Sequence, residues 1–372
     1  MIASPFELMQ LGNVIRFGNG KAIKPGGAGS YPVFGSNGII GHSDEFRYEN
    51  GIVIGRVGAY CGSVEYCPGK FWASDNTLVA FPANENFDTK YLFYLLHNTN
   101  LSTYAGGAAQ PLVTQTVLKQ VEVNIPPLST QRRIAGILSA YDELIENNQR
   151  RIRILEDMAR SLYREWFVHF RYPGHESIPL VDSALGQIPQ GWEVRVVDDV
   201  LKRVPSGKKY DQKTASPIGT VSILDQGKSG IIGYHDDEPG VYATEDNPII
   251  VFANHTCYQR LILFPFSAIQ NVLPFVPNPS LKRDIYWLHW ATNRLIVFND
   301  YKGHWPEFIA KELVVPPPEI SERFGSFASP VTREILKLER AIENLRRTRD
   351  LLLPRLLSGQ IALATDTLPI TA

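Results

Sequence analysis

The chain has 372 residues, of which 44% are hydrophobic and 20% charged, as in a globular protein with room for two or three domains. Its 37 basic and 38 acidic residues give a formal net charge of −1, so contact with nucleic acid requires a local basic patch. Three scattered cysteines exclude a disulfide framework and a four-cysteine zinc site. We find neither a signal peptide nor an apolar run near the roughly 20 residues of a membrane span, and expect a cytoplasmic protein.

Residues 1–127 are predicted to form a mixed, strand-rich domain. Frequent glycines mark turns, and the apolar runs at 51–55 and 78–81 are typical of buried strands. Residues 89–97 have the pattern of a short helix. Alternating apolar residues at 121–125 predict a closing strand, which ends at two prolines.

A long helical pattern covers residues 128–168 and recurs over 319–360. In both copies apolar residues alternate at spacings of four and three, and the copies align without gaps at an offset of 190 residues. This period indicates a coiled-coil seam, and each helix of about 40 residues would be about 60 Å long. Because neither helix can leave such a stripe in water, we predict that they pack against each other. Two unrelated core helices would not share this register.

Two polar residues, Asn148 and Arg349, interrupt the predicted seam. A polar seam residue fixes register at a cost in stability, so a Leu at position 148 is expected to stabilise the protein. Pro330 either separates two helices or kinks one long helix, and the unbroken heptad favours the kink. The predicted seam positions are Ile134, Leu138, Tyr141, Ile145, Asn148, Ile152, Leu155, Ala159, Leu162 and Trp166, with Phe324, Ala328, Val331, Ile335, Leu338, Ile342, Leu345, Arg349, Leu352 and Leu356.

A second domain is predicted at residues 191–318, after a Pro- and Gly-rich linker at 169–190. Residues 361–372 are predicted to form a frayed tail. The second domain repeats the first in outline but with different loops, which suggests one fold used for two different ligands. The matched positions are Gly20-Lys21 with Gly207-Lys208, Gly38–His42 with Gly230–Tyr234, Asp75–Leu78 with Gln270–Leu273, and Tyr91 with Tyr286.

Motifs of the common enzyme classes are missing from the sequence. There is no Walker-type phosphate loop, no Gly-x-Ser-x-Gly elbow and no His-Glu-x-x-His motif. The Asn-Pro segments at 247–249 and 278–280 lack the following Pro-aromatic pair of adenine methyltransferases. The eight histidines form no ligand-spaced set. We therefore interpret the chain as a binding protein without catalytic or metal-ligating residues.

Several loop side chains are suited to DNA. Lys and Arg can contact phosphates or guanine edges, and Asn and Gln can pair with N6 and N7 of adenine. Each residue alone is explained more simply as a solvated loop residue, and Asn271 as part of a turn. The candidate DNA-binding residues are Lys21, Asn37, Arg56, Lys70, Gln110, Lys208, Lys209, Gln259, Arg260 and Asn271.

The order of domain, long helix, domain and long helix resembles the specificity subunit of a Type I restriction–modification system. Residues 125–135 (IPPLSTQRRIA) are similar to the start of that family's first conserved helix, and 162–167 (LYREWF) to its end. Residues 348–359 (TRDLLLPRLLSG) are similar to the family's C-terminal signature. The resemblance covers nearly the whole chain and is most specific in the helices.

This resemblance implies an α+β fold, in which two target-recognition domains are separated by two long antiparallel coiled-coil helices. Each domain would read one half of an asymmetric bipartite site in double-stranded DNA. The helices would set the spacing and dock two modification subunits, which restriction subunits can join. S-adenosylmethionine would be bound by the modification subunit, and ATP and Mg by the restriction subunit, with no cofactor on this chain and no membrane contact.

The helix starts carry the candidate docking residues. Arginines in a first helical turn oppose the helix dipole, which indicates either a partner surface or a solvated face. The second copy has Ser321-Glu322-Arg323 where the first has Gln131-Arg132-Arg133, so equal docking of two modification subunits is not expected if this segment is used. The docking candidates are Gln131, Arg132, Arg133 and Arg323.

Two other classes compete with this interpretation. A fused restriction–methyltransferase would need a methyl-donor site, and two reader domains with two helices leave no room for one. A scaffold protein whose coiled coil only joins partners is compatible with the near-neutral charge. Such a scaffold would bind no defined DNA sequence, so the salt dependence of DNA binding separates it from a DNA reader.

Overall fold

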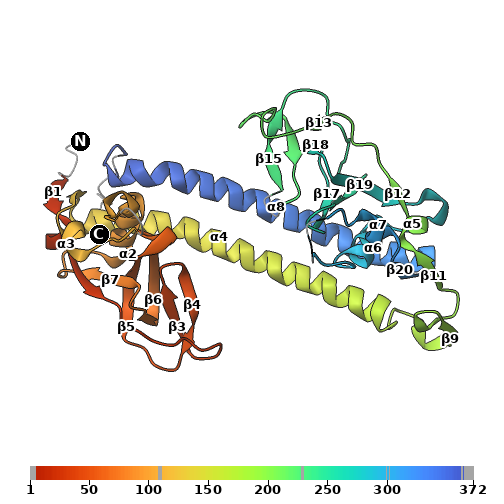
Figure 1. The fold of residues 1–372 in the computed structure, drawn as a ribbon, viewed down its shortest axis with the longest axis horizontal. Helices are drawn as coiled ribbons and strands as arrows, with labels where there is room; N and C mark the ends of the chain where they lie inside the picture. Colours follow the sequence, from red (N-terminus) through yellow and green to blue (C-terminus); the bar gives the residue numbers. More distant parts are fainter. Residues whose placement is uncertain are drawn as a thin grey trace, which may run out of the picture. The chain divides into compact units, whose positions relative to one another are not determined.

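The computed structural model describes residues 6–107, 111–227, 230–298, 300, 302–361 and 363 (Figure 1). The chain forms two compact units. The first comprises Met1–Asn148 with Ala341–Ala372, and the second comprises Gln149–Arg340. Each unit therefore combines one mixed domain with a part of both long helices.

The first unit is built on a six-stranded sheet in the order β2-β7-β5-β6-β3-β4, in which only β3 and β6 pair in parallel. A second, two-stranded antiparallel sheet pairs β1 with β8. The elements are β1 (Glu7–Gln10), α1 (Leu11–Val14), β2 (Ile15–Asn19), β3 (Tyr31–Gly35), β4 (Gly38–Ser43), β5 (Tyr48–Gly55), η1 (Gly58–Tyr60), β6 (Val64–Ala73), β7 (Thr77–Pro82), α2 (Thr89–Asn98), η2 (Leu101–Tyr104), α3 (Gln115–Lys119) and β8 (Glu122–Ile125).

The surroundings of strand β5 explain why its sequence is a continuous apolar run. Ile52 and Ile54 point into a core that they share with Leu92 of α2. Val53, between them, points to the opposite face and packs with Phe71 in a smaller core. Both faces of the strand are therefore buried, so alternation with polar residues is absent. The strands predicted at 51–55, 78–81 and 121–125 and the helix at 89–97 are confirmed.

The second unit contains a four-stranded sheet in the order β12-β19-β16-β17 and another in the order β13-β18-β14-β15. A two-stranded sheet again pairs its first and last strands, β11 and β20. The elements are β11 (Glu193–Val196), α5 (Val197–Val200), β12 (Leu201–Arg203), β13 (Lys209–Tyr210), β14 (Val221–Leu224), β15 (Ile231–His235), β16 (Ile249–Ala253), β17 (Gln259–Ile262), β18 (Phe266–Ile269), β19 (Val272–Pro277), η5 (Pro279–Leu281), α6 (Ile285–Thr292), α7 (Trp305–Ile309) and β20 (Glu312–Val315).

The segment predicted as a linker at 169–190 contains regular structure. It includes a single turn, η4 (His175–Ser177), and a hairpin of β9 (Leu180–Ser183) and β10 (Gly186–Pro189). Gly186 has a φ of 95°, which allows the tight reversal of the hairpin. The Pro and Gly residues that suggested a linker therefore belong to turns of a folded hairpin. The predicted frayed tail lies outside the described residues, apart from Ile361 and Leu363, which pack against the first core.

The two mixed domains repeat one fold, as their elements follow in the same order and their hairpins match in detail. Hairpins β3–β4 and β14–β15 are each bulged at the same place. Gly41 and Gly233, which follow the bulges, have φ values of 156° and 157°. A Cβ atom on Gly41 would lie 2.8 Å from a backbone oxygen, and on Gly233 2.7 Å from another, so both positions require glycine. The predicted duplication is confirmed at the level of the backbone.

One predicted correspondence is wrong by a residue. Asp88 caps α2 by accepting a hydrogen bond from the Tyr91 amide, and Asp284 caps α6 by accepting from Trp287. Tyr91 and Trp287 both stand three residues after the cap and are both 0% exposed. Tyr91 therefore matches Trp287 and not Tyr286, because the aromatic identity misled the alignment where the caps define the register.

The long helices are α4 (Leu128–Tyr163), continued by a π-helical turn, η3 (Arg164–Val168), and α8 (Pro318–Leu357). These bounds agree closely with the predicted 128–168 and 319–360. None of the predicted seam positions is exposed. Helix α8 runs unbroken through Pro330, so the alternative of two separate helices is wrong.

The helices run antiparallel within each unit (Figure 1). In the first unit Leu138 shares a core with Leu353, and further along α4 Asp142 forms an ion pair with Arg349, at 2.5 Å. In the second unit Arg151 pairs with Glu334 at 2.8 Å, and Phe167 packs edge-on against Phe324. In both units a later residue of α4 meets an earlier residue of α8.

Arg349 forms an ion pair at its predicted seam position. Its carboxylate partner, Asp142, also accepts a hydrogen bond from the Tyr94 hydroxyl of α2. Burial and this hydrogen bond raise the pKa of Tyr94, so the hydroxyl stays protonated and keeps donating. The polar group at the seam therefore connects α2, α4 and α8 of the first unit.

Gln131 joins the first mixed domain to the start of α4. Its side chain is 1% exposed, accepts the Asp88 amide at 3.0 Å and donates to the carbonyls of Pro126 and Asn86 at 2.9 and 3.1 Å. At the matching position of α8, the Ser321 hydroxyl accepts the Asp284 amide. The prediction that Gln131 contacts a partner is therefore wrong, because its polar atoms are used inside the unit.

We expect Gln131→Ala to destabilise the first unit by about 2 kcal/mol, because three backbone groups, of Asn86, Asp88 and Pro126, lose their partner. Chemical denaturation of the whole chain, followed by amide exchange in α2, measures this change. Arg132→Ala, at the exposed neighbouring position, should alter stability by less than about 0.5 kcal/mol. Equal stabilities of the two variants would contradict this role of Gln131.

We expect Asn148→Leu to stabilise the first unit, because an apolar side chain replaces a polar one at a partly buried seam position. A gain of about 1 kcal/mol corresponds to a rise in melting temperature of about 2–4 °C for a unit of this size. Asn147→Leu, which makes the same change at an exposed position, is the control and should give no rise. A clear loss of stability in Asn148→Leu would argue against the seam assignment.

Candidate nucleic-acid interface

In the first unit, three of the predicted DNA-binding residues gather around the turn between β6 and β7. The Lys21 amide bonds to the last residue of β6 at 2.9 Å, and the Arg56 amide bonds to the Asn76 carbonyl at 2.9 Å. Ser36, which precedes Asn37, donates its hydroxyl to the same Asn76 carbonyl at 2.7 Å. Three loops distant in sequence therefore converge, with Lys21 and Asn37 exposed and Arg56 partly buried.

The other two DNA-binding candidates of the first unit are Lys70 and Gln110. Lys70 is exposed on β6, and its ammonium lies 4.3 Å from the centre of the Phe46 ring. This contact orients the lysine and leaves its charge accessible. Gln110 lies outside the described residues.

A pocket of about 310 Å³ opens beside Arg56. The Gln115 side chain at its wall donates to Asn19 Oδ1 at 2.8 Å, although the two residues are 96 positions apart. Sequence reasoning did not select Gln115 or Lys119, and only the folded chain brings them next to Arg56. The lining residues are Asn19, Arg56, Leu78, Thr114, Gln115, Thr116 and Lys119.

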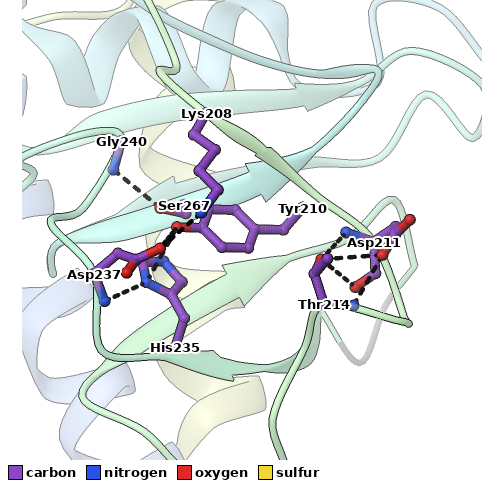
Figure 2. Close-up of polar contacts among 8 residues, drawn as sticks. All are labelled: Lys208, Tyr210, Asp211, Thr214, His235, Asp237, Gly240 and Ser267. Carbon is purple, nitrogen blue, oxygen red and sulfur yellow. Dashed lines mark hydrogen bonds and ion pairs between the residues drawn. The ribbon is translucent and has the colours of Figure 1, made fainter.

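In the second unit, Lys208 belongs to a polar cluster with Tyr210, His235 and Asp237 (Figure 2). Its ammonium lies 2.8 Å from the Asp237 carboxylate, which also accepts the Tyr210 hydroxyl at 2.9 Å. These two hydrogen bonds hold the pKa of Asp237 below its usual value. The Tyr210 and His235 rings stack at 4.1 Å, and His235 Nδ1 accepts the Asp237 amide. Within the cluster, the Asp237 carboxylate thus balances the positive charge of Lys208.

Lys209 points away from this carboxylate. Its ammonium bonds to the Ser206 hydroxyl, and burial together with the charge of Arg203 lowers its pKa. A lysine beside an arginine without an intervening carboxylate marks a locally positive surface. Lys208 and Lys209, adjacent in sequence, therefore lie in opposite electrostatic surroundings.

Gln259 is a core residue and not a base-reading residue. It is 6% exposed, and its amide donates to the His289 carbonyl at 2.8 Å and accepts from the Thr292 hydroxyl at 3.0 Å. Asn271 has a φ of 68° and forms the β18–β19 turn, where its carbonyl accepts the Asn254 amide. Gln259 is therefore neither a DNA-reading residue nor a solvated loop residue, whereas the alternative of a turn residue holds for Asn271.

Arg260 lines a cavity of about 890 Å³ in the second unit, between β17, α6 and the helix pair. Its guanidinium donates to the Asp225 carbonyl and lies where a side chain on Gly230 would otherwise stand. Burial lowers the pKa of Arg260 and raises that of Glu339, which also lines the cavity. Burial also lowers the pKa of His289 to about 4, which keeps its imidazole neutral at physiological pH.

Of the remaining docking candidates, Arg132 and Arg323 are exposed, and Arg133 is partly buried. Arg323 donates to the Pro173 carbonyl at 3.4 Å, a contact long enough to be readily exchanged. Within the described ranges there is no group of three or more His, Cys, Asp or Glu residues that could hold a metal ion. No helix among those residues is long and apolar enough to cross a membrane.

Comparison of the sequence with known proteins finds similarity to one family. Residues 3–157 match the family model of the Type I restriction modification DNA specificity domain. The chain is 26% identical over 302 residues to the MjaIX specificity subunit of Methanocaldococcus jannaschii, covering 73% of this chain and 69% of that protein. It is 32% identical over 132 residues to the EcoprrI specificity subunit of Escherichia coli, covering 35% and 33% of the two chains.

The fold also matches a solved structure. The S subunit of a Type I restriction–modification system from M. genitalium superposes with a TM-score of 0.69 at 15% sequence identity, covering 95% of this chain and 96% of that one. At this identity the match concerns the fold, and the sequence matches carry the family. Residues 3–157 thus carry the DNA specificity domain of Type I restriction–modification systems, and the chain is similar in sequence to Type I specificity subunits.

Proposed function

We propose that this chain is the non-catalytic subunit that selects the DNA sequence for a Type I methyltransferase and endonuclease complex. Each mixed domain contacts one half of a split, asymmetric site in double-stranded DNA. The long helices set the distance between the halves, at about one helical turn of DNA or some 34 Å. The strongest support comes from the duplicated backbone. The two copies match at Gly41 and Gly233 but carry different polar loops.

The differences lie at positions suited to reading DNA. Arg56, whose amide bonds to the turn residue Asn76, is matched by Asn254, whose amide bonds to the turn residue Asn271. A guanidinium can hold a phosphate, whereas the Asn254 carboxamide is engaged by the Trp305 amide, which it accepts at 2.8 Å. Two copies with different side chains at such a position contact DNA differently, so the site as a whole is asymmetric.

The proposal includes partners that supply the chemistry. Two modification subunits, which bind S-adenosylmethionine, dock on the helices near the exposed Arg132 and Arg323. Restriction subunits with ATP and Mg join the complex where the system has them, and the complex acts on DNA in the cytoplasm. Because the exposed Arg132 of the first helix start is replaced by the exposed Glu322 in the second, the two modification subunits meet non-identical surfaces.

A methylation map of the host genome, with and without this gene, tests the function. We expect the deletion to remove one split, asymmetric methyl-adenine motif, and the intact gene supplied in trans to restore it. An unchanged map, with the modification subunit shown to be expressed, would reject the role in sequence selection. A scaffold that only joins partners would then explain the coiled coil better.

We expect Asp237→Asn to strengthen binding of the assembled complex to DNA, because the substitution frees the Lys208 charge for a phosphate. One additional phosphate contact steepens the plot of log K against log salt by about 0.9. Glu193→Gln, which frees Arg195 from a similar exposed ion pair, is the control for the change in net charge. Identical slopes for both variants and the wild type would place Lys208 away from the DNA.

A further inference from the structure

We propose that the pocket beside Arg56 in the first unit binds one phosphodiester group of the DNA backbone, and that the second unit has no equivalent contact. This assignment rests on the proposed DNA-binding function and specifies which residues of one domain hold the backbone. Neither Gln115 nor Lys119 was selected from the sequence. Both acquire a role only from their position in the folded domain.

The pocket has the chemistry of an anion site. Its volume is about 310 Å³, and none of its lining residues is acidic. Arg56 and Lys119 contribute two positive charges, and Thr116 contributes an exposed hydroxyl. Arg56 Nε is buried and has no hydrogen-bond partner within the described residues. A buried donor that lacks a partner costs free energy, which a phosphate oxygen would recover.

The remaining polar wall is already oriented. Gln115 Nε2 donates one hydrogen to Asn19 Oδ1 at 2.8 Å, so the direction of the carboxamide is set and its second hydrogen is available to a ligand. Arg, Lys, Gln and Thr donors around one hollow match the acceptor-only oxygens of a phosphodiester. A base edge presents donors as well as acceptors, and this wall offers few acceptors for them.

Close packing holds Lys119 at the rim. Leu118, next to it in α3, is 0% exposed in the core of the unit. Gly12 of α1 lies directly against Lys119, and a Cβ atom on Gly12 would stand 3.0 Å from Lys119 Cβ. The backbone of α3 is thus fixed on both sides, while the Lys119 ammonium remains exposed. A fixed backbone with a free charged end suits a phosphate clamp.

The second unit fills the same place with an indole ring. Trp305 begins α7 as Gln115 begins α3, and Phe308, like Leu118 three residues after the helix start, is 0% exposed. The Trp305 ring packs on Phe308 and lies 4.7 Å from the Arg203 guanidinium. Asn254, which replaces Arg56, accepts the Trp305 amide at 2.8 Å. The pocket is therefore a property of the first unit.

The test is the salt dependence of DNA binding by the complex of full-length chain and modification subunits, with DNA that contains or lacks the recognition site. Lys119→Gln removes one phosphate contact, so the slope of log K against log salt should become shallower by about 0.9. Between roughly 50 and 200 mM salt its affinity should fall about 3.5-fold less than that of the wild type. The loss of affinity at low salt should be the same on both DNAs.

Lys90→Gln is the matched control. It removes the same charge from the same unit, at a lysine of α2 that lies 3.6 Å from Glu143 and outside the pocket. Its slope should equal that of the wild type. Arg56→Gln should reproduce the Lys119→Gln result, and thermal melting of both variants checks that the unit folds.

Two results would overturn the assignment. Wild-type slopes for Lys119→Gln and Arg56→Gln would show that no phosphate occupies the pocket. A loss confined to DNA with the recognition site, at an unchanged slope, would assign the pocket to a base. A wild-type complex that shows no preference for its site would instead reject the proposed function itself, so the two failures are distinguishable.

Discussion

The fold depends on the burial of two apolar helical stripes that cannot remain in water. Helices α4 and α8 each extend through both units, and within each unit they pack against each other, as Leu138 does with Leu353 and Phe167 with Phe324. The domains are attached to this pair by hydrogen bonds at the helix starts, Gln131 to the cap of α2 and Ser321 to the cap of α6. Each mixed domain is thus joined to its helix start at a buried side chain, Gln131 in the first unit and Ser321 in the second.

In the duplicated domain, the residues required by the backbone conformation are distinct from the residues that differ between the two copies. The bulge glycines Gly41 and Gly233 are retained because a side chain there would collide with backbone atoms. The residues that differ, Arg56 against Asn254 and Gln115 against Trp305, lie in the loops and at the start of a short helix. Such positions can change without altering the core, so one fold can carry two different sets of loop side chains.

Much of the fold could be predicted from local patterns, and less of the site. The heptads, the apolar strands and the duplicated turns are short-range signals, and each corresponds to an element of the structure. The linker was misjudged because Pro and Gly mark hairpin turns as readily as loops. Gln259 and Gln131 were misjudged because burial depends on distant segments, His289 for the one and Asp88 for the other. Residue type alone does not separate a buried amide from an exposed one.

The near-neutral charge of the chain is consistent with selective DNA binding, because its cations are not equivalent. The charge of Lys208 is balanced by Asp237, and Arg260 lines the same cavity as Glu339. Around Arg56 and Lys119 the pocket contains no carboxylate. Acidic partners thus balance some of the cations, while the proposed phosphate pocket around Arg56 and Lys119 contains none. A protein arranged in this way gains little from general electrostatic attraction and depends on geometric fit, as sequence selection requires.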